Sequence, residues 1–104
     1  MKLLTKELRN KLPELYANEQ KKAEDTPVIV KFFDPTGSWT WYATEGSKEG
    51  DDFIFFGYVR GDDNELGYFS LIELESARGA LGLGIERDKY FGRHSLAEVM
   101  AKRL

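Results

Sequence analysis

The sequence contains no cysteine and only one histidine, His94. The lack of cysteine excludes disulfide bonds and thiolate metal sites, and it is typical of a cytoplasmic protein. A serine–histidine–acid triad would have to use His94, and the chain has no GxSxG motif to supply the nucleophile. His94 precedes a predicted helix in a basic stretch, so we do not expect it to bind a metal or to act as a base.

Long hydrophobic runs are also missing. None approaches the roughly 20 apolar residues that a membrane-spanning helix needs, and the charged start MKLLTKELRNK is not typical of a secretory signal. The hydrophobic content of 41% is nevertheless ordinary, which argues against intrinsic disorder. We therefore expect a single domain over residues 1–104, in the cytoplasm and away from membranes.

Charge is distributed unevenly along the chain. Residues 1–31 contain seven Lys/Arg and five Asp/Glu, a net charge of +2. Residues 32–75 contain two Lys/Arg and ten Asp/Glu, a net charge of −8. Residues 76–104 contain six Lys/Arg and three Asp/Glu, a net charge of +3. The acidic centre has two interpretations. Aspartate and glycine suit the turns of a sheet, whereas an acidic surface also attracts a basic partner.

The N-terminal residues show helical periodicity. Leu4, Leu8 and Leu12 recur every four residues and predict a helix that begins near Thr5, a suitable N-cap. Pro13 interrupts this pattern, so we predict a second short helical turn starting there and a polar loop over residues 17–27.

Four stretches rich in aromatic and β-branched residues predict strands. They lie at residues 28–33, 39–45 (WTWYATE), 53–60 (FIFFGYVR) and 66–71 (LGYFSL). The connections between them are too short for helices, which predicts an antiparallel meander. With the leucine-striped helix as its cover, this meander predicts an α+β fold.

Two capping-box patterns follow the strands. Ser70 with Glu73, and Ser95 with Glu98, have the spacing in which a serine and a glutamate cap the first turn of a helix. They predict helices over residues 71–78 and from Ser95 to about Arg103. The expected architecture is therefore a four-stranded antiparallel meander sheet with an N-terminal helix and C-terminal helices packed on it.

Several ordered blocks of the sequence resemble one known family. The blocks LLTKELRNKLPELY, WTWYATE, ELGYFSLIELE and GLGIERD occur in this order between Leu3 and Phe91. Together they resemble an uncharacterised bacterial family, domain-of-unknown-function family 2958. The resemblance implies a bacterial protein associated with mobile elements such as plasmids, and it implies no activity.

The stretch WTWYATE is the densest aromatic segment. Strict alternation places Trp39, Trp41 and Glu45 on one face of the strand and Tyr42 on the other. The tryptophans are expected to lie mainly in the core, with an aromatic binding platform as the alternative. Glu45 is expected at the rim of their face, in an ion pair with an arginine; the candidates are Arg60, Arg78 and Arg87.

The balance of these features favours a non-enzymatic module that binds a protein partner, while leaving catalysis open. An aromatic sheet face and an acidic surface would form the binding site; its candidate residues are Trp41, Tyr42, Glu45, Tyr68, Glu73 and Arg78. One alternative is a small-ligand or hydrolytic site built on Glu45, Glu73 and Arg78. Single-stranded nucleic acid is the less favoured ligand, because the aromatic strands lie in the acidic segment. We expect no catalytic residue, metal or cofactor.

Overall fold

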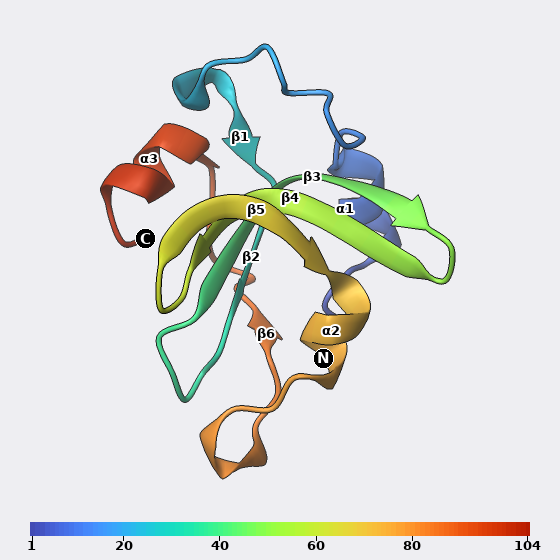
Figure 1. The fold of residues 1–104 in the computed structure, drawn as a ribbon, viewed down its shortest axis with the longest axis vertical. Coiled ribbons are helices and arrows are strands. Elements are labelled where there is room, and N and C mark those ends of the chain that lie inside the picture. Colours follow the sequence, from blue (N-terminus) through green and yellow to red (C-terminus); the bar gives the residue numbers. More distant parts are fainter.

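Five antiparallel strands form the central sheet in a computed structural model that describes residues 1–104 (Figure 1). Their order is β5-β4-β3-β2-β6, and their bounds are β2 (Val30–Phe33), β3 (Thr40–Glu49), β4 (Asp52–Arg60), β5 (Asn64–Ser70) and β6 (Glu86–Arg87). The four predicted strands are confirmed as a meander, but the predicted number was too low by one. The fifth strand, β6, has only two residues, which is too short to produce a recognisable alternation of apolar and polar positions.

Smaller elements surround this sheet. β1 (Pro27–Val28) pairs with β7 (His94–Ser95) as a separate two-stranded sheet. The α-helices are α1 (Lys6–Lys11), α2 (Leu71–Ser76) and α3 (Leu96–Ala101), and the 3-10 helices are η1 (Ala23–Asp25) and η2 (Ala80–Gly82). The α+β class is therefore confirmed. None of these helices has the length and apolar composition needed to cross a membrane.

The second helical turn predicted from Pro13 is wrong. Residues 15–20 form successive turns instead. Some of their backbone donors bind β3 instead of continuing a helix, because the N–H group of Leu15 binds the Ser47 hydroxyl and that of Tyr16 binds the carboxylate of Glu45. The segment after α1 is thus hydrogen-bonded to β3, and its internal backbone bonds are those of single turns, such as the bond from the N–H of Ala17 to the carbonyl oxygen of Glu14.

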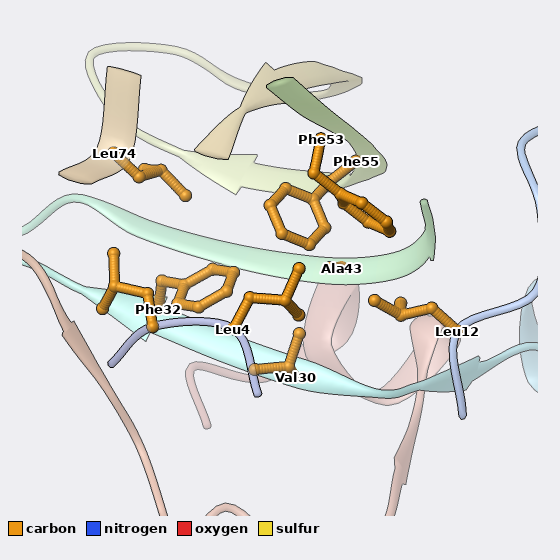
Figure 2. Close-up of a cluster of buried hydrophobic side chains, with 9 residues drawn as sticks. Leu4, Leu12, Val30, Phe32, Ala43, Phe53, Phe55 and Leu74 are labelled. Atoms are coloured by element: carbon orange, nitrogen blue, oxygen red, sulfur yellow. The ribbon is translucent and has the colours of Figure 1, made fainter. Parts of the chain in front are cut away.

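One face of the sheet packs under the N-terminal segment and α2. Leu4 and Leu12 point toward the aromatic side chains of the sheet, including Phe32 and Phe55, while Leu74 of α2 lies at one side of the cluster (Figure 2). The predicted leucine stripe is therefore confirmed as the cover of this face.

The other face packs under α3, which lies on the left of Figure 1. Its buried core is Val28, Tyr42, Tyr58, Leu96 and Val99. The buried Arg60 ties α3 to the sheet, because its Nη2 donates to the carbonyl oxygens of Val99 and Lys102 at 2.5 and 3.2 Å. Packing elements on both faces, even though α3 covers only part of its face, explain why β4 is apolar at consecutive positions.

Of the two predicted capping boxes, only one forms completely. Ser95 accepts from the N–H of Glu98, and the Glu98 carboxylate accepts from the N–H of Ser95. Ser70 accepts from the N–H of Glu73, but no return bond from the Glu73 carboxylate forms. Ser70 is also the last residue of β5, and its hydroxyl donates to Asp52, whose carboxylate accepts the N–H of Ile72 in the first turn of α2. Asp52 therefore caps an N–H group in the first turn of α2, a role that the sequence pattern did not assign to it.

A β-bulge interrupts the pairing of β3 with β4. Ala43 pairs with Gly57, but the next pair is Glu45 with Phe56, so Thr44 is the extra residue. An extra residue shifts all following side chains to the opposite face. Glu45 therefore does not share a face with Trp39 and Trp41, and the strict alternation predicted from the sequence is wrong beyond Thr44.

The core packing predicts the effect of truncating Phe55, which is fully buried. Phe55→Ala should reduce the free energy of unfolding by about 3–5 kcal/mol, because it removes apolar contacts and leaves a cavity. Tyr90→Ala is the matched control, since Tyr90 is 94% exposed and its loss should cost less than about 0.5 kcal/mol. Urea unfolding measures both. Equal effects of the two substitutions would contradict this packing.

The cap at α2 predicts a pH dependence of stability. Hydrogen bonding to Ser70, aided by the N–H of Ile72, holds the pKa of Asp52 below its ordinary value of 3.8. Because the pKa is lower in the folded chain, Asp52 stabilises the fold above that ordinary value, and this contribution is lost as the pH falls through the folded-state pKa. Wild type should therefore be more stable than Asp52→Asn at about pH 6, with a difference that shrinks toward about pH 2. Urea unfolding measures it; a constant difference would refute the cap.

Candidate functional site

Three side chains form a row across the sheet on the α3 side. Glu45 of β3 pairs with Phe56 of β4, and Phe56 pairs with Tyr68 of β5. Paired residues of neighbouring antiparallel strands project from the same face. The bulge at Thr44 is what brings the carboxylate into line with the two aromatic rings.

The carboxylate of Glu45 binds the segment that follows α1. Its Oε1 accepts the backbone N–H of Tyr16 and its Oε2 accepts that of Asn18, each at 2.8 Å. The Asn18 side chain adds a bond from its Nδ2 to the carbonyl oxygen of Thr44 at 3.3 Å. Glu45 thereby fixes a surface segment against β3 beyond Ala43, where the pairing of β3 with β2 ends.

This attachment holds Tyr16 in a strained backbone conformation. Its φ angle of 74° lies in the left-handed region, which few residues other than glycine adopt. The ring packs against Tyr68 in an edge-to-face arrangement, with centroids 6.4 Å apart, although the two residues are 63% and 54% exposed. Strain of this kind is concentrated at functional sites. Two exposed tyrosines are thus held together where neither contributes to the buried core.

A cavity of about 340 Å³ lies beside these rings, and we call it the Tyr16–Tyr68 cavity. It combines aromatic, acidic and hydroxyl groups; its lining residues are Tyr16, Asn18, Glu19, Lys21, Thr26, Thr44, Glu45, Phe56, Tyr68 and Leu96. Pockets of roughly 300 Å³ and more, with apolar walls and a few convergent polar groups, are typical of ligand sites. It is therefore the candidate functional site.

The electrostatic environment of the cavity is negative. The neighbouring Tyr16 side chain raises the pKa of Tyr68 above its ordinary value, and partial burial and the nearby carboxylates of Glu45 and Glu19 raise it further. Glu45 is only 4% exposed and forms no ion pair. The predicted pairing of Glu45 with Arg60, Arg78 or Arg87 is therefore wrong.

Two predicted binding residues of β3 lie away from the cavity. Trp41 is half-buried against the core under the N-terminal segment, on the opposite face of the sheet. Tyr42 is fully buried under α3, where burial raises its pKa and its hydroxyl donates to the carbonyl oxygen of Leu104 at 2.7 Å. Trp39 is 39% exposed and stacks on Trp41, so the two tryptophans are only partly in the core.

Glu73 and Arg78 also lie outside the cavity. Glu73 is exposed on α2. Arg78 is exposed as well, and its Nη1 donates to the carbonyl oxygens of Glu75 and Ala77 at 3.0 and 2.7 Å. It lines a different cavity of about 510 Å³ with Met1 and Glu86. Among the six predicted residues, only Glu45 and Tyr68 line the same cavity.

Sequence reasoning missed Tyr16, Asn18 and Phe56 as parts of this site. Asn18 and Tyr16 lie in a segment without periodicity, and their role depends on a bond to a carboxylate 27 and 29 residues away. Phe56 could have been found from the apolar run of β4, because this strand is apolar on both faces and one of them can form a binding surface. No group of three or more histidine, aspartate or glutamate side chains is placed to hold a metal ion.

The model of the family described as “Protein of unknown function (DUF2958)” matches residues 3–102, so the chain belongs to this family. This confirms the resemblance seen in its sequence blocks. No curated protein and no solved structure matches the chain. What the site does is therefore inferred from its own chemistry.

The attachment of residues 16–18 predicts the effect of Glu45→Gln. The amide replaces one acceptor oxygen by a donor, so one of the two N–H groups loses its partner. We expect the free energy of unfolding to fall by about 1–3 kcal/mol and the amide exchange of Tyr16 or Asn18 to accelerate, as measured by NMR. Glu49→Gln, on the exposed end of β3, is the matched control. Unchanged stability and exchange in Glu45→Gln would refute the attachment.

Proposed function

We propose that the chain is a protein-interaction module that binds an extended, basic segment of a partner along the open edge of β5. β5 pairs with β4 on one side and is the outermost strand of the sheet on the other. The outer edge of such a strand presents backbone N–H and C=O groups that an added strand can pair with. This open edge beside two exposed tyrosines is the observation that carries the proposal.

The side chains of β5 fit this role. Leu66 and Tyr68 alternate on the α3 side and are 45% and 54% exposed. A bound strand would cover them, and Tyr16 would extend the same apolar contact beyond the sheet. Tyrosines that are exposed in the free protein and buried on binding commonly dominate the energy of protein interfaces.

The charge of this edge indicates the class of partner. Asp62, Asp63 and Glu65 are exposed at the start of β5, and Glu19 is exposed beside the cavity at Tyr68. A segment rich in lysine and arginine would complement these carboxylates and associate faster as a result. The same charges would repel nucleic-acid phosphates, which argues against the single-stranded nucleic-acid alternative.

The hydrolytic alternative has weaker support, because Glu45, Glu73 and Arg78 do not line a common cavity.

We propose that the chain is encoded by a mobile element and that its partner is a basic protein in the bacterial cytoplasm. It rests on the family resemblance and on the acidic edge together.

Binding of a designed peptide tests the proposal. An extended peptide of about ten residues, with Lys or Arg alternating with Val or Thr, should perturb the NMR amide signals of residues 64–70 in the wild-type chain. Tyr68→Ala should weaken this binding about tenfold or more, since exposed tyrosines anchor interfaces. Tyr90→Ala is the matched control, because Tyr90 is exposed on a different loop.

Three results would contradict the proposal. Perturbation confined to residues outside β5 would show that the edge is not used. A glutamate version of the peptide binding as tightly as the basic one would show that the acidic surface does not select the partner. Self-association of the free chain through β5, detected by sedimentation, would assign the edge to a second copy of the chain instead.

A further inference from the structure

We propose that the Tyr16–Tyr68 cavity receives the guanidinium group of an arginine from the bound segment, held by aromatic rings and by Glu45 and Glu19. This inference rests on the proposed function, since the arginine would belong to the peptide paired with β5. It assigns the cavity to one chemical group, the guanidinium group. The aromatic rings and the carboxylates of the cavity each match a property of that group.

The aromatic walls of the cavity can stack on a guanidinium group. Phe56 and Tyr68 have ring centroids 5.1 Å apart at an interplanar angle of 60°, and Tyr16 and Tyr68 lie 6.4 Å apart at 61°. All three of these rings line the Tyr16–Tyr68 cavity. The faces of aromatic rings carry negative electrostatic potential, which attracts cations, and arginine stacks on them better than lysine does.

The negative charge of Glu45 can pair with the positive charge of a guanidinium group. Buried carboxylates are normally paired with a cation or metal, yet Glu45 is 4% exposed and its only partners are two backbone N–H groups. Each carboxylate oxygen accepts about two hydrogen bonds, so Oε1 and Oε2 each retain acceptor capacity after binding Tyr16 and Asn18. A guanidinium group would supply both the missing positive charge and further donors.

One cation already lines the cavity. Lys21 is exposed there but forms no ion pair with Glu45 or Glu19. Its ammonium is free to move away when a ligand enters, and its positive charge opposes that of an incoming arginine. Lys21→Ala should therefore tighten binding of an arginine peptide, by about two- to fivefold for a partly screened charge.

The cavity also lies within reach of a strand added to β5. Tyr68 is at once a residue of the open edge and a wall of the cavity. Alternate side chains of an added strand would project toward the α3 side, where the row of Tyr68, Phe56 and Glu45 runs inward from the edge. A long side chain at one of these positions would follow that row toward the carboxylate.

The experiment compares one peptide in three forms, with arginine, citrulline or lysine at the position opposite Tyr68. Citrulline keeps the planar shape of arginine without its charge. Isothermal titration with the wild-type chain should show about tenfold weaker binding of the citrulline form, and weaker binding of the lysine form than of the arginine form. With Glu19→Gln and with Glu45→Gln, the preference for arginine over citrulline should shrink, because the substitutions remove the complementary charge.

The outcomes separate this inference from the proposed function. Equal binding of the arginine and citrulline forms, with β5 signals still perturbed, would overturn the cavity assignment and leave the β5 interaction intact. Equal binding of the arginine and lysine forms would overturn the assignment to guanidinium. Absence of binding by all three forms would overturn both proposals. Glu19→Gln keeps the test decisive if Glu45→Gln fails to fold, since Glu19 is exposed.

Discussion

The paired hydrogen bonds from Tyr16 and Asn18 to the carboxylate of Glu45 are the interaction on which the candidate site depends. They require a carboxylate on the α3 side of the sheet, and that position exists only because Thr44 is an extra residue in β3. Without the bulge, Glu45 would project into the apolar core under the N-terminal segment, where an ionised group has no partner. The bulge thus converts a position of the core face into an anchor for a surface segment.

The two cores explain why this anchor lies where it does. α1, α2 and the N-terminal residues cover one face of the sheet, whereas α3 covers only part of the other. Figure 1 shows α3 beside one end of the twisted sheet, with β5 as the outermost strand. The uncovered part of this face contains Phe56 and Tyr68, and the segment of residues 15–20 borders it. A small domain has few elements with which to cover two sheet faces, and the exposed tyrosines are located where the cover ends.

Much of the fold could be predicted from local signals. The leucine spacing around Leu8, the strand sequences and the cap at Ser95 each act within a few residues, and the structure confirms them. Features that depend on distant partners could not be predicted in this way. The cap of α2 uses Asp52, 20 residues before Ile72, and β6 exists only through its pairing with β2.

The candidate site was predictable only in part for the same reason. Tyr68 and Glu45 stood out by residue type, and both line the cavity. Their placement on the same face of the sheet depends on a bulge that strict alternation does not reveal. The sequence therefore placed Glu45 on the face of Trp41, whereas in the structure it lies beside Phe56. Tyr16 gave no signal at all, because its left-handed conformation and its contact with Tyr68 arise from the attachment to Glu45.

The most direct test of this account is a measurement of nuclear Overhauser contacts in the wild-type chain in solution. If Glu45 holds the segment of residues 16–18 against the sheet, the ring protons of Tyr16 should show contacts with those of Tyr68, and the backbone amide of Tyr16 should show contacts with the side chain of Glu45. Contacts of the Glu45 side chain with Trp41, and none between the two tyrosine rings, would show that the bulge and the site it builds are absent.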